Sequence, residues 1–206
     1  FENMLKWTNE RDIFVQIELW DQWDHNRDSW DNNPWNPDAN VNYSTSDTYL
    51  KGNGNYQNIR HNSKAQHDLF LTVPKVNDDK MVLKYQQKFI DKVLSHSFQY
   101  DHVLYTVTNE LFNQHPVEWS LYWIDFVKQS AKQKGKQIYI TEMFQEIDIT
   151  REIHRIALDN PQIFDYIDTS QNSGQIDETH WNHLQWVRNY ISEQPRPINH
   201  TKTYGG

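Results

Sequence analysis

The chain has 206 residues, a formal net charge of −8 and no cysteine. The negative charge argues against a general nucleic-acid partner, because a phosphate backbone is bound by a basic surface. Without cysteine there is neither a disulfide framework nor thiolate chemistry, and no apolar run approaches the roughly 20 residues of a membrane-spanning helix. Length and even composition predict one domain over residues 1–206 with no membrane partner, and they leave the oligomeric state undetermined.

Strand-like and helix-like stretches alternate along the whole chain. Runs of apolar and β-branched residues predict five strands, at residues 13–20, 103–110, 137–144, 164–172 and 196–201. Apolar residues at helical spacing predict five helices, at residues 1–11, 81–94, 116–134, 149–158 and 178–193. This alternation is typical of a parallel sheet with right-handed crossovers. It fits an open doubly wound sheet or most of a (β/α)8 TIM barrel truncated at both ends, and the lack of a glycine-rich phosphate loop after any strand favours the barrel.

A long polar segment, residues 21–79, separates the first two predicted strands. It is rich in Asn, Asp and Gly, and loops of such length in compact domains are usually functional or disordered. Aromatic residues interleaved with the polar ones favour an ordered, functional segment: Trp23, Trp30, Trp35, Tyr43, Tyr49 and Tyr56. Trp20, Trp23 and Trp35 could be flat platforms for sugar rings, or they could hold the segment onto the core by packing.

Polar side chains occur at the carboxyl ends of four predicted strands, where ligands bind in parallel α/β proteins. The second strand ends in Asn109 and Glu110, and a carboxyl group at the end of a core strand is costly to bury unless it is paired or used. The third strand carries Glu142. The remaining candidates for substrate binding lie on the first and fourth strands: Glu18, Asp21, Gln171 and Asn172.

Glu110 and Glu142 come from consecutive strands and can form the two carboxyl groups that a glycosidase needs. One protonates the leaving oxygen and the other acts as nucleophile or base, at a separation of ~5 Å for retention or ~6.5–9.5 Å for inversion. Each candidate also has a structural alternative. Glu110 could cap the following segment, Glu142 could hydrogen-bond a neighbour, and Glu18 could point outward toward a helix.

Ten histidines raise the question of a metal site. No three of them have the spacing of metal ligands, and the Asn- and Asp-rich residues 31–40 lack the regular spacing of a calcium loop. We therefore expect neither a metal nor a cofactor, and a metal-dependent hydrolase is kept only as an alternative hypothesis.

The run from Val103 to Glu110, a strand that ends in Asn-Glu, resembles the fourth strand of the clan A (β/α)8 glycoside hydrolases. Further stretches are similar to bacterial apiosidase-like and endoglucanase-type barrels: Asn36-Pro37, residues 70–78, residues 85–94 and residues 167–172. The resemblance implies a partial barrel with strand-helix units 3 to 7, in a secreted or periplasmic bacterial protein that acts on carbohydrate. It assigns the general acid/base to Glu110, with Asn109 positioning a sugar hydroxyl.

The seventh-strand stretch departs from that family. Clan A enzymes carry their nucleophile Glu at the end of this strand, and residues 197–204 contain no Glu. Glu142 or a residue beyond Gly206 would then supply the second carboxylate, while Lys202 could pair with a carboxylate nearby and lower its pKa. The expected function is two-carboxylate hydrolysis of a polysaccharide or oligosaccharide. The main alternative is a non-catalytic carbohydrate-binding barrel.

Overall fold

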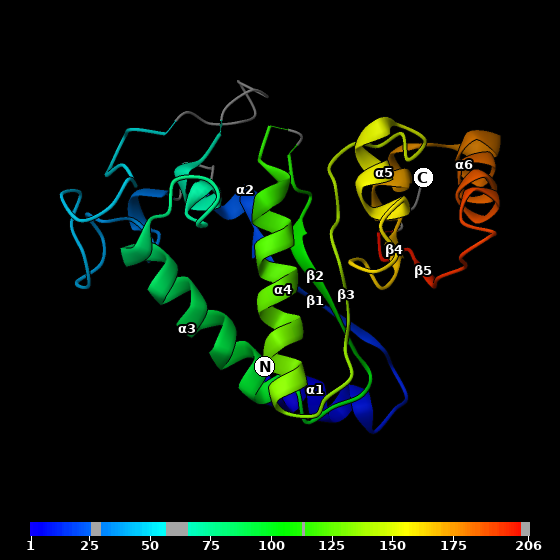
Figure 1. Ribbon diagram of the computed structural model, residues 1–206, viewed down its shortest axis with the longest axis horizontal. Coiled ribbons are helices and arrows are strands. Elements are labelled where there is room, and N and C mark those ends of the chain that lie inside the picture. Colours follow the sequence, from blue (N-terminus) through cyan, green and yellow to red (C-terminus); the bar gives the residue numbers. More distant parts are fainter. Residues whose placement is uncertain (26–29, 57–65, 113, 203–206) are drawn as a thin grey trace.

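The computed structural model of the protein describes residues 1–25, 30–56, 66–112 and 114–202 (Figure 1). Its helices are α1 Glu2–Asn9, α2 Gln22–His25, α3 Lys80–Ser97, α4 Val117–Gln133, α5 Glu152–Leu158 and α6 Asp177–Tyr190. Its strands are β1 Val15–Asp21, β2 Val103–Asn109, β3 Tyr139–Thr141, β4 Ile167–Asp168 and β5 Ile198–Asn199. Each strand and helix predicted from the sequence is present, in most cases shorter than expected. None of the described helices is long and apolar enough to cross a bilayer.

The strands form two small parallel sheets. β1, β2 and β3 pair in that order, and β4 pairs with β5. In the larger sheet Val15 lies opposite Val103, and Asp21 lies opposite Asn109. The central strand β2 is buried along most of its length, as its nearly continuous apolar sequence predicts for a parallel strand covered on both faces.

The expectation of a (β/α)8 barrel is wrong. The described residues form six helices and five short strands divided between two sheets, whereas a barrel requires one closed ring of paired strands. The interruption lies between β3 and β4. There the Asp165 carboxylate accepts the backbone N–H of Ile140 at 3.0 Å, a role that a carbonyl oxygen has in a continuous ladder. β4 and β5 are two residues long, so the second sheet remains a short separate pair within an α/β arrangement.

One backbone hydrogen bond, from the N–H of Asp165 to the carbonyl oxygen of Ile140 at 3.0 Å, and several side-chain hydrogen bonds connect the two sheets instead. The Gln16 amide on β1 donates to Oδ2 of Asp168 on β4 at 3.1 Å, and the Gln16 oxygen accepts from Asn199 on β5 at 2.5 Å. The Tyr166 hydroxyl lies 3.0 Å from that Gln16 oxygen and 2.9 Å from the carbonyl oxygen of Tyr105 on β2, so it can donate to either. Residues that follow these strands are therefore held close enough to form one site.

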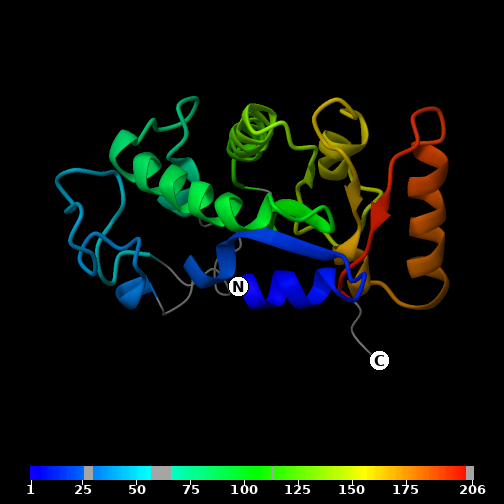
Figure 2. The same ribbon diagram turned by 90° about the horizontal axis from the view of Figure 1, so that it is seen from below.

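An aromatic core fills the space between the larger sheet and helices α3 and α4, which lie on the same side of it (Figure 2). Trp20 is 2% exposed and packs against Trp119 and Trp123 of α4 at centroid distances of 5.5 and 5.3 Å. It also packs against Phe89 of α3 at 5.4 Å and against Trp35 of the long segment at 5.7 Å. These contacts favour the packing role of Trp20 and Trp35 over a role as sugar platforms.

Buried histidines anchor the long segment to the chain that follows β2. The His67 ring stacks on Tyr56 at 3.7 Å, and the His115 ring lies 4.7 Å from Phe70. The backbone N–H of His67 donates to Nε2 of His115 at 3.4 Å. Burial lowers the pKa of His25 and of His115 to about 4 and holds the pKa of His67 well below its usual range, so these rings are neutral at pH 7.

We predict that the protein loses stability on mild acidification. The unfolded chain protonates His25 and His115 near pH ~6.5, whereas the folded protein does so only near pH 4. Their contribution to stability is therefore fully present above about pH 6.5 and is lost as the pH falls toward 4, by on the order of 3 kcal/mol for each of His25 and His115. Urea unfolding of the wild type and of His115→Asn across this range measures the effect. The free energy of unfolding of the variant should decline less steeply with falling pH than that of the wild type. Equal slopes for the two proteins would contradict the prediction.

Candidate functional site

The chain leaves β2 through a strained turn at Glu110. Four non-glycine residues in the described part of the chain have positive φ; three are aspartates, which tolerate this conformation, and the fourth is Glu110 with φ of 57°. Such a backbone costs on the order of 1–3 kcal/mol and persists where neighbouring contacts enforce it. Gln22 supplies these contacts, since its side chain donates to the carbonyl oxygen of Glu110 and accepts the backbone N–H of Phe112 at 2.9 Å. These two hydrogen bonds fix the backbone at Glu110, and with it the direction in which the Cα–Cβ bond of Glu110 leaves the chain.

The Glu110 carboxylate is half-buried and has three polar partners. Lys202 Nζ donates to Oε1, the indole N–H of Trp23 donates to Oε2 at 2.7 Å, and Gln171 donates a further hydrogen bond. Burial acts to raise the pKa of Glu110. The hydrogen bond and the charge of Lys202, together with the bonds from Trp23 and Gln171, outweigh burial and lower this pKa below its usual range. Glu110 is therefore an anion at neutral pH.

Asn109 and Asp21 extend the cluster along the pairing of β1 and β2. Lys202 Nζ donates to the side-chain oxygen of Asn109 at 2.6 Å, and the Asn109 amide donates to Oδ1 of Asp21 at 3.3 Å. The same Asp21 oxygen accepts the backbone N–H of Trp23 at 2.9 Å, which fixes Asp21 at the start of α2. Asp21 and Asn109 meet because they face each other in the strand register.

Glu18 lies in the electrostatic field of the same cluster. Its side chain reaches solvent, and it makes no hydrogen bond to the residues that the structure describes. The strands around it still desolvate the carboxyl group, which raises the pKa of Glu18; Asp168, Asp21 and Glu110 raise it further, and Lys202 opposes them. Glu18 keeps its proton to a higher pH than an isolated Glu, whereas Glu110 loses its proton at a lower one.

Asp168, at the end of β4, is the buried carboxyl group of the cluster. It accepts from the Gln16 amide at 3.1 Å and from the backbone N–H of Ser170 at 2.8 Å. Burial raises the pKa of Asp168, and the bonds from Ser170 and Gln16 together with the charge of Lys202 reverse this only in part. Asp168 thus holds the second sheet against β1 and adds to the acidic surroundings of Lys202.

Glu142 does not join this cluster. It is 1% exposed, and its Oε1 accepts the backbone N–H groups of Thr108 at 2.8 Å and of Met143 at 3.0 Å. Its Oε2 lies 2.5 Å from the hydroxyl of Ser120 on α4. Burial raises the pKa of Glu142 to about 8 against the effect of these hydrogen bonds. Glu142 is therefore protonated at neutral pH. Its hydrogen bonds to Thr108, Met143 and Ser120 give it a structural role between β2, β3 and α4.

The predicted binding residues on the fourth strand separate in the same way. Gln171 reaches Glu110 and also lies 3.7 Å from the sulfur of Met143. Asn172 is fully buried and donates to the backbone oxygen of His180 at 2.9 Å, so it positions the start of α6. Of the predicted residues, the structure brings together those at the ends of β1, β2 and the fourth strand with Lys202: Glu18, Asp21, Trp23, Asn109, Glu110, Gln171 and Lys202.

The chain was compared with protein-family models, characterised proteins and solved structures. None of them matches. The resemblance to clan A glycoside hydrolases therefore remains an expectation, and function has to be argued from the cluster. Within the described ranges, no three His, Cys, Asp or Glu side chains are grouped so as to hold a metal ion. Residues 203–204 of the predicted seventh-strand stretch lie outside the described residues.

Sequence reasoning missed three residues that hold the cluster in place, namely Gln16, Gln22 and Asp168. Asp168 carried a usable signal, because it is a carboxyl group within the predicted strand 164–172, where a buried charge is costly unless it is paired or used. The two glutamines carried none. An amide inside a strand or at the start of a short helix has no periodicity of its own, and its role appears only when distant strands are placed side by side.

We expect Glu142→Gln to preserve stability at low pH and to increase it at high pH. Because the folded-state pKa of Glu142 is raised, its contribution is fully present below about pH 4.3 and is lost as the pH rises through about 8. Gln keeps the acceptor for Thr108 and Met143 and cannot ionise. Thermal unfolding followed by circular dichroism should give a higher midpoint for the variant near pH 9 and similar midpoints near pH 5. A lower midpoint at both pH values would contradict this assignment.

Proposed function

We propose that the Glu110 cluster hydrolyses glycosidic bonds, with Glu110 and Glu18 as its two carboxyl groups. The observation that supports this is the presence, around one lysine, of one carboxyl group held as an anion and another that favours its proton. Cleavage of a glycosidic bond needs such a pair, because one group protonates the leaving oxygen while the other attacks the anomeric carbon or activates water.

In this proposal Glu18 is the general acid. It transfers its proton to the glycosidic oxygen as the bond from that oxygen to the anomeric carbon breaks. Glu110 either accepts a proton from the water that attacks this carbon or bonds to the carbon itself before water releases the sugar. The separation of the two carboxyl groups with substrate bound decides between inversion and retention.

These roles differ from those that the family resemblance implies. The resemblance gives Glu110 the acid/base role and leaves Glu142 as a possible partner, but Glu142 is enclosed by backbone N–H groups and Ser120. Asp21 is closer to Glu110 in the strand register than Glu18 is. Its Oδ1 is already bonded to Trp23 and Asn109, so we assign Asp21 a positioning role.

Three neighbours of Glu110 are suited to bind the sugar. The Trp23 ring is held edge to face against Phe112 at 5.3 Å and stays half-buried beside the Glu110 carboxylate. The amide groups of Asn109 and Gln171 can both donate to and accept from sugar hydroxyls. Substrate binding would thus use groups from β2, α2 and the segment after β4.

We predict that Glu110→Gln lowers kcat for hydrolysis of an aryl glycoside by about 10²–10⁴-fold, because Gln can neither attack carbon nor accept a proton from water. Glu18→Gln should cause a smaller loss on a substrate with a good leaving group, since nitrophenolate departs with little help from an acid. The initial rate is measured over a panel of nitrophenyl glycosides, and circular dichroism confirms that each variant is folded.

Glu152→Gln, in the exposed first turn of α5, is the matched control and should keep the wild-type rate. Hydrolysis that survives Glu110→Gln at an unchanged rate would exclude Glu110 from the chemistry.

Replacement of Lys202 by Met tests the electrostatic part of the proposal. Lys202 lowers the pKa of Glu110 by a hydrogen bond and by its charge. Without this cation, the effect of burial, which raises the pKa of Glu110, is opposed only by the hydrogen bonds from Trp23 and Gln171. Because Glu110 must be ionised to act, the acidic limb of the kcat/KM profile should move to higher pH in Lys202→Met. A pH profile that stays in place would show that Lys202 does not control this group.

A second function is favoured by the same ion pair. Lys202 contacts both Asn109 and Glu110, and an anion neutralised in this way can serve as a fixed hydrogen-bond acceptor for sugar hydroxyls in a site without turnover. Calorimetric binding of an oligosaccharide that the protein leaves intact, with binding lost in Trp23→Ala, would support carbohydrate binding alone. Release of reducing ends from the same oligosaccharide would support hydrolysis.

A further inference from the structure

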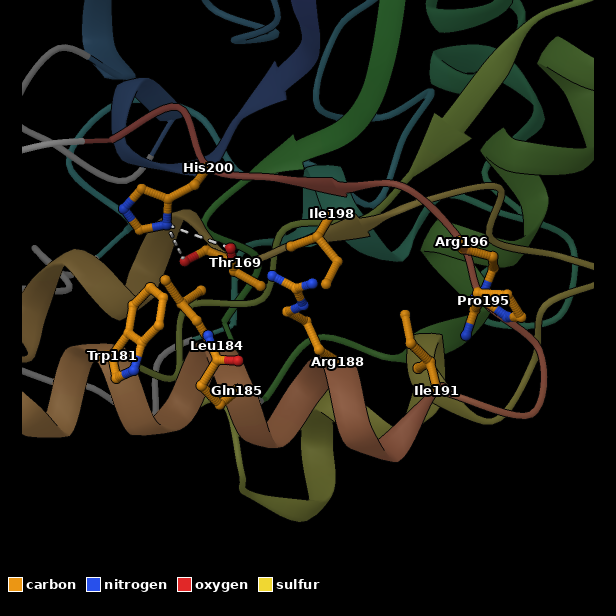
Figure 3. Close-up of a pocket in the computed structure, with 10 residues that line it drawn as sticks. All are labelled: Thr169, Trp181, Leu184, Gln185, Arg188, Ile191, Pro195, Arg196, Ile198 and His200. Carbon is orange, nitrogen blue, oxygen red and sulfur yellow. Dashed lines mark hydrogen bonds between the residues drawn. The ribbon is translucent and has the colours of Figure 1, made fainter.

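A groove of about 550 Å³ runs between α6 and the chain segment that contains β5 (Figure 3). Its volume lies in the range of small-ligand sites. One wall is formed by side chains of α6 and of the residue that follows it, namely Trp181, Leu184, Gln185, Arg188 and Ile191. The opposite wall is formed by Pro195, Arg196, Ile198 and His200.

The residues of this first wall follow one another at helical spacing, and the last of them, Ile191, caps the end of α6. Positions i, i+3, i+4, i+7 and i+10 share one face of a helix, and Val187 is the one residue of α6 that is buried. Trp181 is 60% exposed at one end of this face. Two turns further on, about 10 Å along the axis, Arg188 points its guanidinium group toward Thr169 and Ile198 (Figure 3).

The groove is lined by two arginines in a protein whose net charge is −8. Arg188 and Arg196 line it, and none of its lining residues in the described part of the chain is Asp or Glu. Arg188 makes no hydrogen bond or ion pair with the residues that the structure describes. An unpaired guanidinium two helical turns from an exposed indole fits a ligand that combines an anionic group with a flat ring at the other end.

Arg196 has a different role in the same groove. Its terminal nitrogens donate to the backbone oxygens of Ala157 at 2.9 Å, Leu158 at 2.5 Å and Phe164 at 3.0 Å, and these bonds satisfy the end of α5. Its Nε is buried without a partner among the described residues, and a buried donor is costly until an acceptor reaches it. Arg196 therefore shapes the wall, while Arg188 is free to bind.

We propose that this groove binds an acidic oligosaccharide, with a sugar ring stacked on Trp181 and a ring carboxylate bound by Arg188. The flat C–H face of a pyranose packs on an indole, and a guanidinium group holds a carboxylate through two parallel hydrogen bonds. The two-turn separation requires at least two linked rings. Leu184 and Ile198 cover ring edges between the two ends, and Gln185 can bond to a hydroxyl.

The site is separate from the Glu110 cluster. Asn199 bonds to Gln16 on the side of the cluster, whereas the next residue, His200, places Nδ1 2.9 Å from the backbone oxygen of Thr169 on the side of the groove. Successive residues of an extended chain point to opposite faces. The segment of β5 thus divides an acidic cluster from a cationic groove, and binding in the groove does not depend on hydrolysis at Glu110.

Isothermal titration calorimetry with α-1,4-linked trigalacturonate tests the proposal. The wild type should bind this probe more tightly at low salt than at high salt, and should bind the fully methyl-esterified trimer, which has the same rings without charge, at least about tenfold more weakly. Arg188→Gln should weaken binding of the acid by about tenfold or more, and Trp181→Ala by up to about tenfold.

Matched controls are available on α1 and just after it, far along the sequence from the groove. Trp7 is 56% exposed and Arg11 has a largely exposed side chain, so Trp7→Ala and Arg11→Gln should bind trigalacturonate as the wild type does. The proposal is overturned by absence of binding, by equal binding of the ester, or by Arg188→Gln and Trp181→Ala variants that bind normally. It is also overturned if sedimentation shows a dimer that Trp181→Ala dissociates, because the groove would then be an interface between two copies of the chain.

Discussion

The hydrogen bonds of Gln16 are the interaction on which the rest of the site depends. No backbone ladder joins the two sheets within the described residues, and the Gln16 side chain bonds to Asp168 on β4 and to Asn199 on β5 from a single position on β1. Lys202 follows Asn199 by three residues and reaches Glu110 on β2. Gln16 therefore helps to place the second sheet where Lys202 can reach Glu110, together with the bonds of Tyr166 to Tyr105 and of Asp165 to Ile140.

The cluster concentrates negative charge around a single ammonium group. Glu18, Asp21, Glu110 and Asp168 all lie in its electrostatic environment, and mutual repulsion among them would destabilise the folded chain if all four were ionised. Two effects limit the repulsion. Lys202 contacts Glu110 directly, and burial favours the protonated forms of Glu18 and Asp168, with neighbouring carboxylates adding to this effect at Glu18. The same interactions that limit this repulsion also raise the pKa of Glu18 and lower the pKa of Glu110, so that one carboxyl group favours its proton and the other is an anion.

Local pattern predicted the strands and helices, because apolar periodicity is a property of short stretches. Closure of a barrel is not a property of short stretches, and its prediction was wrong. The Asp165 carboxylate accepts the backbone N–H of Ile140 at the place where a neighbouring strand would have to pair. Glu110 was found because a carboxyl group at the end of a buried strand is conspicuous. Glu142 gave the same signal and turned out to be enclosed by α4, since the side to which a strand-end residue points depends on register and on the packed helix. Trp20 likewise became core through contacts with helices distant in the sequence.

Glu110 and Glu142 show how two carboxyl groups on adjacent strands come to differ. Both are removed from water to some extent and both accept hydrogen bonds, yet the pKa of Glu110 is lowered while that of Glu142 is raised to about 8. The partners of Glu142 are neutral donors, which reduce the cost of burying a charge without cancelling it. Glu110 has in addition the full charge of Lys202. Lys202, which follows the second sheet, therefore determines which of the two glutamates is an anion at neutral pH. Chemistry that needs a carboxylate can occur only at that position.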